Sequence, residues 1–548
     1  MSASSILTGA VVRPRHGGPA VEALGVRDGV VVACGTVEGV RAELPGADEL
    51  VLGRGAVLPA FVDAHQHAFL VAIDPTTDRL HRAAHDIPDL LARLRELVSA
   101  EPAGSGWLRF HGYEPLHLAE RRSPTAAELD SVCPDRPLHV VSRTYHESSV
   151  NSAGLAALGI GRGTREPHGG RIVRDRRGVP TGVLLESESF RAEAASRRDD
   201  GTWRERAAAY AKTVLAAGIT RIGDAAVPAD LADEFVTVMG EAGVVVEPLL
   251  VGNRIDEPAF VAGRTAKVLA DGGEYCDFCF TGRQVARLFA QSLRATFTQD
   301  GDLVRALARR TGTPRRGTDG LWHAGIRVTG GPGLQQHLRS AASAGSGLAV
   351  HAVGNGAVAD VVRLLRADPG LLRAVPVRVE HAMVVDEELC RQLGDLGVPV
   401  VAQPGFLSTA GYELEASPVP EPLELMPFRS LLDADASLAF TSDHPATPLD
   451  PWRWVADAEH RLDGHGLLRR PHQRITRAEA LRAATLGGAR ALGVDAGALE
   501  AGAVADLIWV DRDPYEVDDV AAVRTLATWS AGVPVHASSE VAGLLAGG

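Results

Sequence analysis

Short apolar segments alternate with helical patterns along most of this 548-residue chain, and no other feature limits the fold as strongly. An apolar strand near residues 56–67 is followed by seven further β-type runs, at 219–224, 244–251, 265–270, 347–352, 377–382, 398–403 and 438–443. Helical patterns separate most of them, as at 204–217, 334–344 and 386–396. Eight strands with intervening helices predict an α/β fold, a TIM-type (β/α)₈ barrel with its active site at the carboxyl ends of the strands.

Both ends of the chain have a different texture, because they contain short β-type runs separated by turn residues. We therefore predict a small β-sandwich domain built from residues 1–57 and 483–548, with the barrel at 58–482. Two insertions, at about 75–205 and 272–333, follow the first and fourth barrel strands. Insertions at that end of a barrel lie over the active site, so we expect both to shape the substrate pocket.

Composition excludes several classes of protein. The net charge of −13 argues against a nucleic-acid binder. The sequence contains no run of about 18 apolar residues, so we expect no membrane span. The N-terminus shows no signal-peptide pattern. Five scattered cysteines form no disulfide framework and suit a reducing compartment, so we expect a cytoplasmic protein. Cys276 and Cys279 form a lone C-x-x-C, which we interpret as free thiols in a loop.

The first barrel strand ends in two histidines, His65 and His67, one residue apart. Side chains at i and i+2 of a strand point the same way, so both imidazoles would leave the same face. Imidazole is a preferred ligand of zinc and related metals, and a catalytic site needs further ligands from elsewhere in the fold. The pair alone is weak evidence, since such spacings also occur by chance.

Later strand ends supply the missing groups. Lysine is almost absent from the chain, yet Lys267 lies inside the apolar fourth strand. A buried amine has a lowered pKa and is nucleophilic, so it could take up carbon dioxide as a carbamate that bridges two metal ions. His351, His381 and Asp443 end the fifth, sixth and eighth strands. Chance does not readily place such groups at five strand ends.

This order of residues resembles the amidohydrolase superfamily, and more narrowly the branch of YtcJ-like proteins and N-substituted formamide deformylases. The motifs that carry the resemblance span the chain: 58–67 (LPAFVDAHQH), 151–153 (NSA), 180–184 (PTGVL), 267–272, 351–354 (HAVG), 380–382 (EHA), 403–404 (QP), 442–443 (SD) and 497–507. Departures are Ala60 in place of glycine, Asn355 in place of aspartate, and an unusual segment at 273–279. That segment bears on the substrate, while all expected ligands are present.

The resemblance implies a hydrolase of a small-molecule amide, formamide or cyclic amide that works with two divalent metal ions, zinc first and iron or manganese as alternatives. His65, His67 and Asp443 would hold one ion and His351 and His381 the other, with carboxylated Lys267 as the bridge. Asp443 would also act as general acid and base. His146 matches a family histidine that we expect to contact substrate, whereas Glu186 and Arg143 are weaker candidates. A homodimer is also expected.

Two other functions stay open at this point. The first is a mononuclear deaminase on the same barrel. Such enzymes lack the bridging lysine and carry a glutamate three residues after the fifth-strand histidine, where this chain has Gly354. The second is a non-catalytic binding protein that retains the fold, which the intact ligand set argues against. Metal content and amide hydrolysis would separate the three.

Overall fold

The computed structural model describes residues 4–74, 80, 84–197, 201–298, 312–416 and 419–546. Its centre is a sheet of eight parallel strands: β7 (Phe61–Gln66), β13 (Ile219–Pro228), β14 (Val245–Val251), β15 (Thr265–Leu269), β19 (Gly347–Ala352), β20 (Val377–His381), β22 (Val400–Ala402) and β24 (Leu438–Phe440). Each strand pairs with the next in parallel, in chain order. This sheet confirms the predicted barrel class.

The two end strands, β7 and β24, meet through the residues that follow β24. The backbone N–H of Asp443 donates to the carbonyl of His65 at 2.8 Å, and that of Ser442 donates to the Asp63 carboxylate at 3.0 Å. We had expected the eighth strand to run to Asp443, but it ends at Phe440. Residues 441–443 leave the extended conformation, with a φ of 53° at Asp443, and this turn carries its carboxylate over the barrel rim.

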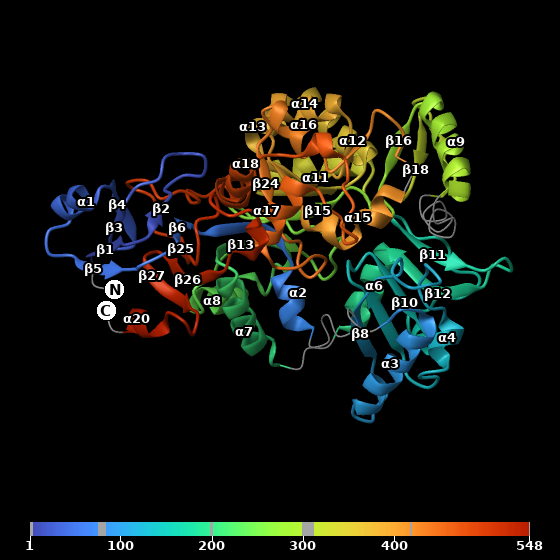
Figure 1. Cartoon of the computed structure of the whole chain (residues 1–548). Helices are drawn as coiled ribbons and strands as arrows, with labels where there is room; N and C mark the ends of the chain where they lie inside the picture. The colour runs from blue at the N-terminus through green and yellow to red at the C-terminus, as the bar shows by residue number, and fades with distance from the viewer. Residues whose placement is uncertain are drawn as a thin grey trace.

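Helices on the outer side of the barrel connect its strands (Figure 1). They include α7 (Trp203–Ala216), α8 (Ala232–Glu241), α11 (Gly331–Ala344), α12 (Asn355–Ala367), α14 (Glu387–Leu396), α16 (Phe428–Asp433) and α17 (Pro451–His460). Local sequence sets their ends. The Asp386 carboxylate accepts from Leu389 N–H at 2.9 Å at the start of α14, and Gly397 ends it with a φ of 64°.

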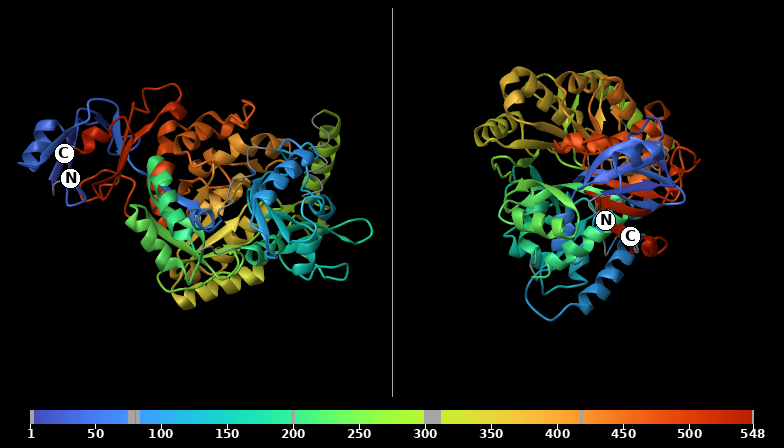
Figure 2. Two further views of the ribbon diagram at one scale, coloured as in Figure 1. Left: turned by 90° about the horizontal axis from the view of Figure 1, so that it is seen from below. Right: turned by 90° about the vertical axis from the view of Figure 1, so that its left-hand side faces the viewer.

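A smaller β domain combines both ends of the chain, whose termini lie near each other (Figures 1 and 2). One sheet has the order β4 (Val30–Gly35), β3 (Ala23–Arg27), β1 (Ser4–Thr8), β5 (Asp48–Val51). The other has the order β2 (Val11–Val12), β6 (Ala56–Pro59), β25 (Leu507–Val510), β26 (Thr525–Ser530), β27 (Val533–Ala537). Apolar residues of both sheets, such as Leu24 and Trp529, share one core. Its boundaries at 57/58 and 482/483 stay predictions.

One of the short β-type runs near the N-terminus, at residues 5–12, predicts a single strand. The structure instead has β1 and β2, which join different sheets. Gly9 separates them with a φ of 76°, a conformation that glycine adopts without strain. The chain therefore crosses from one layer of the sandwich to the other at this residue.

The first inserted segment forms a five-stranded sheet, ordered β11 (Gly170–Arg174), β12 (Pro180–Glu186), β10 (Glu147–Val150), β9 (Leu138–Ser142), β8 (Leu108–Tyr113). Helices α3 (Ile87–Ala100), α4 (Ala126–Asp130), α5 (Ser152–Ala157) and α6 (Ser187–Ser196) accompany it. The second contains β16 (Phe278–Phe280), β17 (Arg315–Arg316), β18 (Trp322–Ala324) and α9 (Gly282–Thr298). No helix among the described residues is long and apolar enough to cross a membrane.

Candidate metal centre

Six side chains from five barrel strands converge at the carboxyl rim of the barrel, and all six line one cavity: His65, His67, Lys267, His351, His381 and Asp443. His65 lies within β7, Lys267 within β15, His351 within β19 and His381 at the end of β20. Because parallel strands end at the same rim, residues far apart in sequence meet there. The structure thus brings together every metal ligand that the sequence suggested.

Asp443 is the meeting point of the first group. Its Oδ1 lies 3.4 Å from His65 Nε2 and 3.1 Å from His67 Nε2. Burial alone would raise the pKa of Asp443, but the two histidines outweigh burial and hold that pKa below its usual value. This carboxyl group is therefore an anion at neutral pH.

His351 and His381 form the second group, with ring centroids 4.4 Å apart. Burial lowers the pKa of His381 to about 4, and that of His351 also falls well below its usual value, so both rings are neutral at neutral pH. The Nε2 atoms of both are buried and have no hydrogen-bond partner among the described residues. Unpaired buried ring nitrogens are costly unless something binds them.

This donor set fits a metal. Among the described residues, one ligand atom each from His65, His381 and Asp443 lie within 4.8 Å of one another, as the ligands of one ion do. Neutral imidazoles with a carboxylate are the ligands that zinc and similar ions prefer. A bound metal ion would satisfy the unpaired Nε2 atoms of His351 and His381.

Lys267 lies beside these groups, with its Nζ 3.5 Å from His65 Nε2 and only 2% of the residue exposed. Burial lowers the pKa of its amine to about 8, although Glu380 and Asp443 act in the opposite direction. The neutral amine is the form that reacts with carbon dioxide. An appreciable fraction of Lys267 is neutral at physiological pH.

Two of the candidate ligand histidines are hydrogen-bonded through Nδ1 to different partners. The Nδ1 atom of His65 is hydrogen-bonded to the buried Glu380 carboxylate, whose other oxygen accepts from Arg378 Nε at 2.6 Å. His381 Nδ1 is 2.8 Å from the amide oxygen of Gln403. Sequence analysis marked the motifs that contain Glu380 and Gln403 but gave neither residue a role.

His146 enters the cavity from the first insertion, and its ring centroid lies 5.1 Å from that of His351. Its Nδ1 pairs with Glu186 at 2.6 Å. Burial lowers the pKa of His146, but the Glu186 charge and hydrogen bond outweigh burial and raise it to about 9. Sequence analysis made Glu186 only a weaker candidate for substrate contact; in the structure it is the direct partner of His146.

Two glycines after β15 make room for this pair. A Cβ at Gly272 would collide with the Glu186 carboxylate, and one at Gly273 would lie 2.7 Å from the His146 ring. Glu186 itself has a φ of 54°, and such strain clusters at functional sites. The Gly272–Gly273 dipeptide was the sequence signal for a side chain packed against this strand end.

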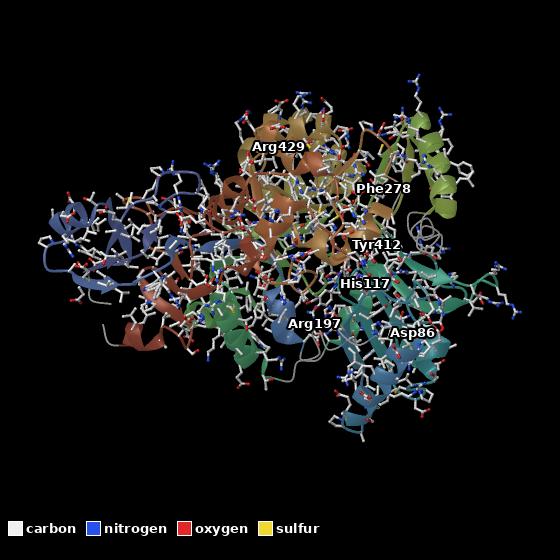
Figure 3. All side chains as sticks on the ribbon, in the orientation of Figure 1. Asp86, His117, Arg197, Phe278, Tyr412 and Arg429 are labelled. Carbon is white, nitrogen blue, oxygen red and sulfur yellow. The ribbon has the colours of Figure 1, made fainter. Side chains whose placement is uncertain are left out.

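The remaining cavity wall is mainly apolar. It includes Leu116, Ile255, Leu269, Cys276, Phe278, Val353, Met383, Val384, Phe406, Ala410, Leu414, Val419, Leu425, Pro445 and Ala446. Phe278 of the second insertion and His117 of the first, both labelled in Figure 3, also line the cavity. Arg143 and Glu413 also line it. The unusual segment at 273–279 therefore contributes to the pocket, as expected of a substrate-determining element.

Cys276 and Cys279 are both free thiols, as predicted. Cys279, however, lies in strand β16 rather than in a loop, and its backbone exchanges two hydrogen bonds with the Asn355 side chain, at 3.0 and 2.7 Å. The departure at Asn355 thus fastens the second insertion to the start of α12. Burial raises the pKa of the Cys276 thiol, so this thiol is not ionised in the pocket.

Comparison with known proteins gives a consistent result. The model of the Amidohydro_3 family, described as the amidohydrolase family, matches residues 52–536. An N-substituted formamide deformylase of Arthrobacter pascens is 30% identical over 93% of this chain and 94% of its own length. The putative amidohydrolase YtcJ of Bacillus subtilis is 25% identical over 91% and 93%. A solved metal-dependent hydrolase of Pyrococcus horikoshii shares the fold, with a TM-score of 0.65 and 21% identity, over 94% of this chain and 99% of that one.

Proposed function

Because this chain belongs to the amidohydrolase family, we propose that it hydrolyses the amide bond of a small N-substituted formamide or a related small amide. It is a metal-dependent enzyme that acts on carbon–nitrogen bonds other than peptide bonds. The observation that carries the proposal is the meeting of five strand-end groups with a buried lysine, where two histidine nitrogens have no hydrogen-bond partner among the described residues. Such a donor set has a clear chemical use in binding metal.

We propose that one metal ion would be held by His65, His67 and Asp443 and a second by His351 and His381, with the carbamate of Lys267 as a further ligand. The short distances from Asp443 to His65 and His67 support the first group, and the unpaired nitrogens of His351 and His381 support the second. His381 also lies within 4.8 Å of His65 and Asp443, so the two positions would be adjacent. Zinc is the first choice of metal, because imidazole and carboxylate ligands suit it. When bound, these ions supply Lewis acidity and an acidified water molecule.

Asp443 is the proton carrier of the reaction. It is ionised at neutral pH and lies at the centre of the histidine group, so it can accept the proton of the attacking water. The same carboxyl group then returns that proton to the nitrogen of the leaving amine as the carbon–nitrogen bond breaks. Protonation is required because an amide anion is a very poor leaving group.

His146 orients the substrate. Its Nδ1 is held by Glu186, so its Nε2 is the atom available to the cavity. With a pKa of about 9, the ring is protonated at neutral pH, and Nε2–H donates to the carbonyl oxygen as negative charge develops there. Glu186 keeps the ring in this orientation.

The pocket favours an apolar substituent on the amide nitrogen. Its volume is about 160 Å³, close to that of a cavity of roughly 150 Å³ that accommodates benzene. The wall formed by Leu116, Phe278 and Leu425 would remove such a group from water. A substituent of about one aromatic ring therefore fits best.

Deamination is disfavoured by the position three residues after His351. A Cβ at Gly354 would collide with the backbone carbonyl of Asp277, so no side chain fits where a deaminase carries its glutamate. The buried Lys267 also has no use in a site with one metal. Cytoplasmic location, homodimer formation and lack of nucleic-acid binding stay predictions.

The test is hydrolysis of a series of N-substituted formamides of increasing apolar size, with formate and amine measured separately. We expect activity that requires added metal, disappears on chelation, and is greatest near single-ring size. Metal content should be about two ions per chain. A protein that binds metal but releases ammonia from amino-heterocycles would instead be a deaminase, and one that hydrolyses no amide would be a binding protein.

A further inference from the structure

The two halves of the metal centre are supported by partners of different charge. In the first half, His65 Nδ1 is hydrogen-bonded to the carboxylate of Glu380. In the second half, His381 Nδ1 is hydrogen-bonded to the neutral amide of Gln403. All four residues are buried, from 0% exposed for Glu380 to 6% for His381. The two histidines thus use the same ring nitrogen but meet unlike acceptors.

Glu380 forms a buried ion pair with Arg378. Arg378 Nε donates to Glu380 at 2.6 Å, and its Nη2 donates to the carbonyl of Ala64 at 2.8 Å, next to His65. Inside a barrel, where apolar residues normally fill the interior, this buried ion pair is an exception. The desolvation of such a pair is costly and must be offset by hydrogen bonds to each group, which His65, Ala64 and Ala491 provide here.

The side-chain amide of Gln403 is held by hydrogen bonds between neutral groups. Its side-chain nitrogen donates to the carbonyl of Val401 and to Thr441 Oγ1, both at 3.2 Å. Those two donations leave the amide oxygen facing His381. The amide orients the ring as the carboxylate orients His65, but it contributes no negative charge.

We propose that these partners make the two metal positions unequal. The position held by His65, His67 and Asp443 binds its ion more tightly, because Glu380 increases the electron donation of His65 and Asp443 adds a second negative charge. The position held by His351 and His381 binds more weakly, since the uncharged amide of Gln403 supports His381 and the Asp271 carboxyl group lies 3.9 Å from His351 Nε2, beyond hydrogen-bond distance. This inference rests on the proposed function, and it makes Glu380 and Gln403 positioning residues that set the order of metal loading.

A carboxylate behind a ligand histidine raises its basicity, and loss of such a partner typically costs about 10- to 100-fold in metal affinity. Sequential filling follows from this difference. At limiting metal, the enzyme carries one ion at the His65 position, and the second ion joins only at higher concentration.

The experiment is a zinc titration of the metal-free, full-length protein in bicarbonate buffer, in competition with a coloured chelator. We expect two binding steps in the wild type. Glu380→Gln should weaken the tighter step by about 10- to 100-fold and leave the weaker step in place. Gln403→Glu should tighten the weaker step. The single-site backgrounds His351→Ala and His67→Ala assign each step to its position.

Glu413→Gln is the matched control, because it removes one carboxylate from the same cavity, and among the described residues the Glu413 carboxylate pairs only with His117 and Arg121, both at 3.9 Å. Neither constant should change in it. Circular dichroism and unfolding of each metal-free variant show whether the variant folds. If Glu380→Gln does not fold, Gln403→Glu still tests whether these partners set the two zinc affinities. Two equal steps, or a tighter step that Glu380→Gln leaves unchanged, would overturn this inference alone. A wild type that binds no zinc would overturn the proposed function.

Discussion

Replacement of Lys267 by methionine should change stability in opposite directions with and without metal. The folded-state pKa of Lys267 is about 8, against 10.5 for an ordinary lysine. Between these two pH values the unfolded chain therefore binds more protons than the folded chain. The free energy of unfolding of the wild type is lowered by the full cost of the buried ammonium below pH 8, and this loss disappears above pH 10.5. At 1.36 kcal/mol per pKa unit, the buried ammonium costs about 3 kcal/mol at pH 7.

In metal-free, carbon-dioxide-depleted buffer at pH 7, we expect Lys267→Met to be more stable than the wild type by about that amount. Near pH 10.5 the two should converge. With zinc and bicarbonate the order should reverse, because only the wild type has the bridge, and ligand binding stabilises a folded state by about 2.7 kcal/mol at 100 times Kd.

Urea unfolding followed by tryptophan fluorescence, with elemental analysis of each sample, measures both effects. A variant that is less stable than the wild type without metal at pH 7 would refute the reasoning about burial. A variant that retains two zinc ions per chain would refute the bridge. A stability difference that does not vary with pH would show that lost packing, rather than ionisation, is the cause.

Three further predictions concern activity. Asp443→Asn removes the proton carrier, and kcat for formamide hydrolysis should fall by about 100- to 10,000-fold, whereas a decrease below tenfold would exclude that role. Glu186→Gln removes the charge that raises the pKa of His146 to about 9, so the alkaline fall in kcat/KM should move to lower pH; an unmoved profile would detach His146 from the reaction. Leu425→Ala enlarges the pocket at a buried position, so kcat/KM should shift about tenfold towards larger substituents, at a cost of about 2–5 kcal/mol in stability. Competition between a small and a large formamide measures the effect of Leu425→Ala on substrate preference directly. An unchanged preference would show that the substituent does not bind beside Leu425.

The local pattern of the sequence was enough for the barrel and for the side chains that meet at its rim. The run at 347–352 is the strand β19 with the predicted ends, and the helix predicted at 386–396 is α14, capped by Asp386. Such elements follow from side-chain periodicity and capping, which are properties of neighbouring residues. Where the chain leaves regular structure, as at Gly9 and at residues 441–443, the predicted strand ends were wrong.

The sequence by itself determined that His65, His67, Lys267, His351, His381 and Asp443 belong to one site, because parallel barrel strands all end at the same rim. Only the tertiary structure decided which residues hydrogen-bond to the histidines of the site. Glu380 reaches His65 across 315 residues of chain, and Glu186 reaches His146 from the neighbouring strand of the inserted sheet, where the Glu186 N–H also donates to the His146 carbonyl at 2.8 Å. These partners depend on the stagger between barrel strands and on how strands pair within the insertion, and neither is written in a local pattern.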